Sequence, residues 1–251
     1  MPRFETPQPI SLELELMVAD VRIEAGDRDD TVVEVRPTDE SKRDDIGAAE
    51  RTRVESTPGR VLVRTPRTWR AYSPFGYGGS IEVRVQLPAG SRVAAKSGMG
   101  AVHASGPLGD SQIKTGLGDI HVERVATARL TSGMGDVEVG HLGGAAELRT
   151  GSGDIRAGEL HGPAVIKNAN GDVRVGAVAS GSVEARTGFG RIDIGVPDGT
   201  AAWLDLSTGY GEVSNGLERT GPPARGEASV QVQAKSGYGD IAINRAYHRV
   251  D

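Results

Sequence analysis

The chain has 251 residues and a formal charge of −5, with 37% hydrophobic and 25% charged residues. This balance indicates a soluble protein with a true core, and the acidic excess argues against a general binder of nucleic-acid phosphates. Cysteine is absent, which excludes disulfides and thiol chemistry but leaves the compartment open.

The first 26 residues carry Glu5, Glu13, Glu15, Asp20 and Glu24 in an alternating pattern. A secretory signal needs a basic start and an unbroken apolar stretch, and this segment has neither. No run in the sequence approaches the roughly eighteen apolar residues of a membrane helix. We therefore expect a cytoplasmic protein without a membrane span.

Residues 1–90 show short stretches with the period-two alternation of β-strands. These stretches are Ile10–Leu16, Val21–Ala25, Val32–Arg36, Val61–Thr65 and Ile81–Leu87. They predict irregular first coils, or a small β cap, ahead of a more regular region. The charged stretch from Asp39 to Val54 interrupts them and predicts a short surface helix or a loop.

The segment after Pro66 concentrates large aromatic side chains in a chain with only 4% aromatic residues. Its candidate binding residues are Arg67, Trp69, Arg70, Tyr72, Phe75 and Tyr77. Tyr, Trp and Arg are enriched at interaction hot spots, so this loop is a candidate partner site. The alternative is a lid that covers the protein without contacting a partner.

A Gly-x-Gly motif recurs through the C-terminal two thirds of the chain. Its second glycines are Gly100, Gly118, Gly135, Gly153, Gly171, Gly190, Gly211 and Gly239, with spacings of 18, 17, 18, 18, 19, 21 and 28 residues. Val or Ile occupies the position two residues after each glycine. A long fixed period with matching columns indicates stacked repeats.

These columns predict an all-β protein, a parallel β-solenoid (β-helix) of about eighteen residues per coil. Parallel crossovers favour right-handed winding, while the number of sides stays open. We expect one domain over residues 1–251. It consists of irregular N-terminal coils (1–90), regular repeats (91–245) and a tail (246–251).

An acidic residue follows most of the repeat glycines, and a hydroxyl residue precedes the motif. The acidic column holds Asp119, Asp136, Asp154, Asp172, Glu212 and Asp240. A row of divalent cations is one interpretation, but the spacer of calcium-binding rolls is missing. We expect instead that each Asp caps amides of its own turn and meets the hydroxyl column, with no bound metal.

Two further columns are candidates for binding. One is basic: Lys96, Lys114, Arg149, Lys167, Arg186 and Lys235. It either contacts an anionic polymer or head group, or offsets neighbouring carboxylates on a solvated face. The residue between the glycines forms the other, which includes Met99, Leu117, Met134, Phe189, Tyr210 and Tyr238. That column is either a partner-binding ridge or a simple stack of neighbours.

The sequence contains no recognisable catalytic set, phosphate loop or cofactor motif. His103, His121, His141 and His161 look evenly spaced, but only the first two share a repeat phase, so we expect them to lie along a surface without converging on a zinc ion. The chain is therefore expected to be no enzyme and to need no cofactor. A carbohydrate-active β-helix enzyme stays a distant alternative.

Units such as Ser132–Val137 (Ser-Gly-Met-Gly-Asp-Val) and Ser236–Ile241 (Ser-Gly-Tyr-Gly-Asp-Ile) resemble the putative-adhesin family of β-strand-repeat proteins, a domain of unknown function. The resemblance covers roughly residues 10–245, and it implies a single-stranded β-helix and supplies no catalytic residues. The leading functional hypothesis is a scaffold or interaction protein that binds a protein partner or itself. The alternative is a binding module for an anionic polymer or cell-envelope component.

Overall fold

The structure, a computed structural model, describes residues 1–66, 79–218 and 228–246. The chain divides into two compact units, Met1–Ala126 and Thr127–Asp251. Strands dominate both units and many pair in parallel, which confirms the predicted all-β class. The single-domain arrangement and the handedness of winding stay predictions. All six candidate residues of the aromatic loop lie outside the described residues.

The first unit contains the whole irregular region, residues 1–90, and the first repeats. Its elements are β1 (Arg3–Glu5), β2 (Ser11–Gly26), β3 (Asp30–Pro37), α1 (Arg43–Arg51), β4 (Arg53–Thr57), β5 (Arg60–Arg64), β6 (Ile81–Pro88), β7 (Arg92–Met99), β8 (Val102–Leu117) and the first part of β9 (Ile120–Met134). The expected N-terminal strands are present, and the charged stretch forms the short helix α1.

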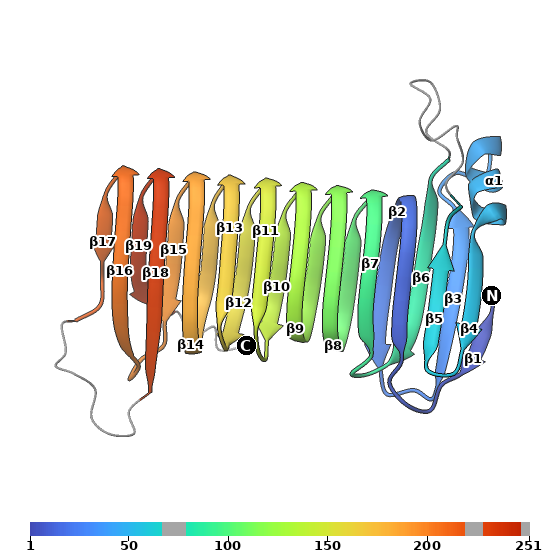
Figure 1. Cartoon of the computed structure of the whole chain (residues 1–251), viewed down its shortest axis with the longest axis horizontal. Helices are drawn as coiled ribbons and strands as arrows, with labels where there is room; N and C mark the ends of the chain where they lie inside the picture. The colour runs from blue at the N-terminus through green and yellow to red at the C-terminus, as the bar shows by residue number, and fades with distance from the viewer. Residues whose placement is uncertain (67–78, 219–227, 247–251) are drawn as a thin grey trace. The chain divides into compact units, whose positions relative to one another are not determined.

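Strand β2 organises this unit because its two halves belong to two rows of strands (Figure 1). The first half pairs in parallel with β5 and β7, and the second half pairs in parallel with β6 and β8. Leu12, Leu14 and Ile23 point inward and are at most 1% exposed. Strand β4 adds antiparallel to β5, and β3 adds antiparallel to β6, so this region is not a set of parallel coils alone.

The second unit repeats one pattern. Its elements are the rest of β9, β10 (Val137–Leu142), β11 (Ala146–Ser152), β12 (Ile155–His161), β13 (Ala164–Asn170), β14 (Val173–Phe189), β15 (Ile192–Val196), β16 (Ala201–Tyr210), β17 (Val213–Asn215), β18 (Ser229–Tyr238) and β19 (Ile241–Arg245). Ile155 pairs with Val137 on one side and Val173 on the other, so neighbours in space lie eighteen residues apart in sequence. All three side chains are fully buried.

The repeat glycines allow the turns of neighbouring strands to stack closely. Gly153 and Gly171 have φ of 130° and 133°, values that L side chains rarely adopt. A Cβ atom on Gly171 would lie 2.1 Å from the carbonyl oxygen of Gly153. Glycine is therefore required at these turns by both backbone conformation and close approach.

The last strands of this unit do not follow chain order. Strand β18 lies between β14 and β16, since Val232 pairs with Val183 and also with Leu204 (Figure 1). Likewise β19 lies between β15 and β17. The loosened spacing near the C-terminus thus reflects an insertion, in which the final strands fill a place between two earlier pairs. Strand β16 pairs with β18 alone among the described residues of this unit.

Candidate binding surfaces

A row of charged side chains crosses five adjacent strands of the first unit. In register they are Arg53 on β4, Arg64 on β5, Glu15 on β2, Lys96 on β7 and Lys114 on β8. All five are exposed. At a strand spacing of about 4.8 Å the row spans about 19 Å. It carries four positive charges and one negative charge, and Glu15 offsets Arg64 at 3.3 Å.

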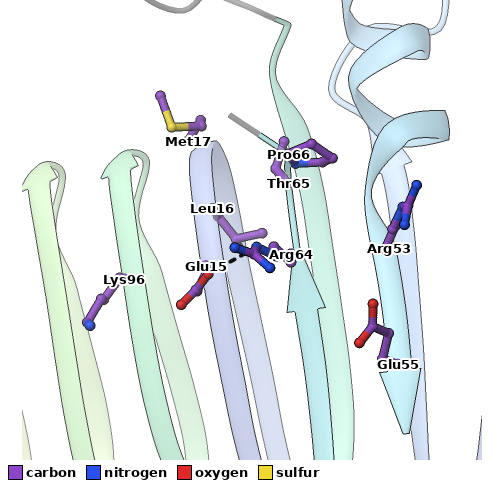
Figure 2. Close-up of a pocket in the computed structure, with 9 residues that line it drawn as sticks. All are labelled: Glu15, Leu16, Met17, Arg53, Glu55, Arg64, Thr65, Pro66 and Lys96. Carbon is purple, nitrogen blue, oxygen red and sulfur yellow. Dashed lines mark ion pairs between the residues drawn. The ribbon is translucent and has the colours of Figure 1, made fainter. Parts of the chain in front are cut away.

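This row borders a hollow of about 630 Å³ (Figure 2). The residues that line it are Glu15, Leu16, Met17, Arg53, Glu55, Arg64, Thr65, Pro66 and Lys96. Figure 2 shows Arg53 and Glu55 on one side and Lys96 on the other, with the Arg64 to Glu15 ion pair between them. The mixture of Arg, Lys and Glu suits a charged ligand better than an apolar one.

The second unit carries a basic row without an acidic member. Arg149, Lys167, Arg186 and Lys235 lie directly beside one another on β11, β13, β14 and β18. Thr131 and Ser207 continue the row on either side. The period of about eighteen predicted Arg149, Lys167 and Arg186 as neighbours. Lys235 lies beside Arg186 because β18 inserts next to β14, which the period did not predict.

Two of the four positive charges in this row are offset by a glutamate that lies two residues earlier in the sequence. Arg186 pairs with Glu184 at 3.0 Å, and Arg149 pairs with Glu147. The corresponding positions beside the two lysines are Val165 and Gln233. Within the described part of the chain, Lys167 and Lys235 have no carboxylate in ion-pair range, so two of the four charges are available to a ligand.

Three aromatic rings form an exposed stack beyond the basic row. Phe189, Tyr238 and Tyr210 end strands β14, β18 and β16, three residues past the basic row or its Ser207 extension. Ring centroids are 5.0 and 4.8 Å apart, and both pairs are within 6° of parallel. The rings remain 57%, 51% and 69% exposed. Neighbour stacking, one of the two interpretations of this column, is therefore present, and the rings still offer their edges to solvent.

The acidic column has a structural role that differs in detail from the prediction. The Oδ1 of Asp136 accepts the backbone N–H of Asp154, and the Oδ1 of Asp154 accepts that of Asp172. The bonded amide thus belongs to the next turn and not to the residue's own turn, because parallel stacking points each carboxylate at its neighbour. Asp20 does the same for Ala101 in the first unit.

The hydroxyl column likewise bonds elsewhere than expected. Thr150 donates to the carbonyl of Gly135 at 2.8 Å, and Thr208 donates to the carbonyl of Gly239 at the same distance. These side chains join turns to one another without touching the Asp carboxylates. The carboxylates are offset by arginine, since Arg156 contacts Asp136 at 2.8 Å and Asp154 at 2.6 Å. The amide of Asp154 and then Arg156 hold the pKa of the Asp136 carboxyl below its usual range.

Sequence reasoning missed some members of these surfaces. It did not place Arg53, Arg64 or Glu15 in the basic row, because they occupy irregular strands with no repeat motif to align. Among the described residues, no helix has the length and apolar character needed to span a membrane.

Comparison with known proteins links the chain to a family and a fold. The family model "Toastrack DUF4097" matches residues 10–244. No curated protein sequence is significantly similar to the chain. A solved structure of a putative adhesin from Bacteroides fragilis is 13% identical, with 96% of this chain and 95% of the other aligned and a TM-score of 0.54. A putative adhesin from Parabacteroides merdae is also 13% identical, with 98% of this chain and 95% of the other aligned and a TM-score of 0.51. At this identity the likeness shows the fold alone.

Proposed function

Because the chain belongs to the Toastrack DUF4097 family, as the sequence resemblance predicted, we propose that it is a non-catalytic scaffold that binds an anionic polymer. The contact surface is the basic row of the second unit, with the aromatic stack beside it. The observation that carries this proposal is the direct register of Arg149, Lys167, Arg186 and Lys235.

The spacing of this row suits a ligand with repeated negative charges. The strands that carry neighbouring cations lie about 4.8 Å apart, which is inside the screening length of about 8 Å at physiological ionic strength. Their mutual repulsion in the free protein is relieved when a polyanion aligns with them. A single small anion engages only one or two of them, so a polymer gains affinity from several contacts at once.

The row keeps a local positive charge in a chain of overall charge −5 because only two of its four cations are paired with carboxylates. The carboxylates of Asp136 and Asp154 accept amides and pair with Arg156. Those of Glu147 and Glu184 pair with the two arginines of the row, so no carboxylate within ion-pair range opposes Lys167 and Lys235 in the described part of the chain. The same use of carboxylates in turn structure supports the non-catalytic part of the proposal.

The test is a calorimetric titration of the chain with two polyanions, polyphosphate and polygalacturonate, at several salt concentrations. The double variant Lys167→Ala with Lys235→Ala should weaken binding at least about tenfold and flatten its dependence on salt. A charge-matched control is Arg22→Ala with Arg84→Ala, two neighbouring arginines in the first unit outside its charged row. Loss of binding in the control to the same degree, or no binding by the native chain at low salt, contradicts the proposal.

A protein partner is the second candidate, and the exposed aromatic side chains favour it. Trp203 is 65% exposed on the edge strand β16, which also carries Tyr210. Aromatic residues dominate protein hot spots, and unpaired strand edges accept further strands. Partner capture that Trp203→Ser abolishes and the double lysine variant leaves unchanged would favour this candidate over the polymer.

The finer description of the fold belongs to the same proposal. We propose a right-handed β-solenoid of about eighteen residues per coil, supported by the eighteen-residue offset between paired strands such as β10, β12 and β14. A crystal structure that traces left-handed connections would contradict it. The proposed location is the cytoplasm, and fractionation of native cells tests it directly.

A further inference from the structure

Two histidines and a glutamate converge on the surface of the second unit. His141 Nδ1 lies 3.3 Å from Glu159 Oε2, and His161 Nε2 lies 2.9 Å from Glu159 Oε1. The two imidazole rings have centroids 4.9 Å apart. One ligand atom from each residue lies within 4.8 Å of the others. The sequence-based expectation that these histidines do not converge is wrong.

Strand pairing explains the convergence. His141 on β10 stands directly opposite Glu159 on β12, eighteen residues later. His161 follows Glu159 by two residues on the same strand, with the buried Leu160 between them, so both point to the same side. Opposite and diagonal neighbours on one face of a pair of strands are within reach of each other. The spacing of 20 residues therefore brings His141 and His161 together even though it departs from the repeat.

The donor set is that of a zinc site with an open position. Neutral imidazole and carboxylate bind Zn²⁺ at about 2.0–2.2 Å, which puts ligand atoms about 3.3 Å apart in a tetrahedron. Each imidazole nitrogen already lies near this separation from one oxygen of Glu159, at 3.3 Å from Oε2 and 2.9 Å from Oε1, so a small rotation of the carboxylate completes the set. The side chains are 44%, 49% and 38% exposed, so an ion can enter and a water molecule can take the fourth position.

We propose that His141, Glu159 and His161 bind one Zn²⁺ ion. The site joins the paired strands β10 and β12, whereas the basic row lies on β11, β13, β14 and β18, so the site is independent of the proposed polymer binding. Glu159 supplies the negative charge that two neutral imidazoles lack, and it is held between them in the absence of metal. The neighbour of Glu159 on the next strand is Ala177, which leaves space beside the carboxylate.

The first unit offers a matched comparison. His103 and His121 also lie on successive strands, with ring centroids 6.1 Å apart. Among the described residues, however, no third His, Cys, Asp or Glu joins them in a cluster that could hold a metal. This pair tests whether two stacked histidines suffice outside a three-residue cluster.

The experiment titrates the full chain with Zn²⁺ against a chromophoric chelator, with Mg²⁺ as the hard-cation control. We expect one tightly bound Zn²⁺ per chain and none for Mg²⁺, which prefers oxygen ligands. Glu159→Gln should lose at least about tenfold in affinity, and His141→Ala with His161→Ala should lose the site. His121→Ala should leave affinity unchanged.

Two outcomes overturn the proposal. One is no zinc binding by the native chain, and the other is one equivalent of zinc that persists in the double histidine variant. Circular dichroism melts check that each variant is folded. Histidine side-chain NMR with Co²⁺ gives an independent readout, since only the resonances of His141 and His161 should shift strongly.

Discussion

The two units build a β core from similar side chains but hold it together differently. In the first unit, antiparallel additions, a helix and individual buried polar contacts fix irregular strands, and the repeat motif occurs only at Gly100 and Gly118. In the second, the same turn recurs, and each turn bonds to the next through its glycines, Asp and hydroxyl. Repetition makes many contacts equivalent, yet it also leaves no room for a side chain at the second glycine of the stacked turns. The two units should therefore differ in which substitutions they tolerate.

The largest expected difference is between a glycine at a stacked turn of the second unit and a glycine at an open turn of the first unit. Gly171→Ala introduces a Cβ atom 2.1 Å from a backbone oxygen at φ 133°, and should cost about 3 kcal/mol or more. Gly59 also has positive φ, at 74°, but a Cβ atom there meets nothing within 4 Å. Gly59→Ala should therefore cost only about 1 kcal/mol. Urea unfolding of both variants measures the difference, and equal losses would remove the contrast between stacked and open turns.

The next effect probes a contact that is not repeated. Asp45 in α1 is buried, and its carboxylate accepts the amides of Ser80 at 2.8 Å and Asp39 at 3.2 Å. Asp45→Ala leaves these amides without their partner and should cost about 1–3 kcal/mol.

Thr150→Val is the matched change in the second unit. It removes one of many similar bonds to a turn carbonyl and should cost about 1 kcal/mol. Hydrogen exchange should show local opening around α1 in the Asp45 variant. A larger loss for Thr150 would mean that repeated bonds are not interchangeable.

The aromatic stack gives a smaller and graded effect. Tyr238 has a ring on each side, whereas Tyr210 has one. At about 0.5–1.5 kcal/mol per ring pair, Tyr238→Ser should cost about twice as much as Tyr210→Ser. Thermal melts compare the two variants. Equal costs would indicate that the stack contributes little and that its rings are held for contact with a partner.

The smallest effect is on the pH dependence of folding. The amide of Asp154 and Arg156 lower the pKa of Asp136 in the folded state, so its stabilising contribution is present above the ordinary aspartate pKa of about 3.9 and is lost as pH falls through the lower folded value. Asp136→Asn should therefore destabilise the protein at neutral pH and make little difference in strong acid.

Asp30 provides the counterpart in the first unit, where Arg28 lowers the pKa of the carboxyl. Asp30→Asn should follow the same direction. Urea unfolding between pH 2 and 7 tests both variants. A penalty for Asp136→Asn that grows toward acid pH would contradict the assigned cause.

The sequence predicted the regular part well because stacking imposes a strict pattern. Ile155, Val173 and Gly171 sit where the alternation and the glycine period put them, and the charged stretch before Val54 does contain a helix. Aligning the glycines also predicted the neighbours of Lys167 and Arg186. The first unit was less predictable because β2 carries Ala19 where later repeats have the second glycine of the motif. Without that glycine, the motif did not indicate that β2 pairs with β8.

The sequence by itself determined which residues face inward and which columns run along the strands, since a period of two and a period of about eighteen are both local properties of the chain. Only the tertiary structure decided the order of the strands. It placed β18 between β14 and β16, aimed the Asp136 carboxylate at the amide of the next turn, and brought His141 and His161 to Glu159. These outcomes depend on which strands become neighbours, and any strand with the right alternation can fill the same place in a parallel row.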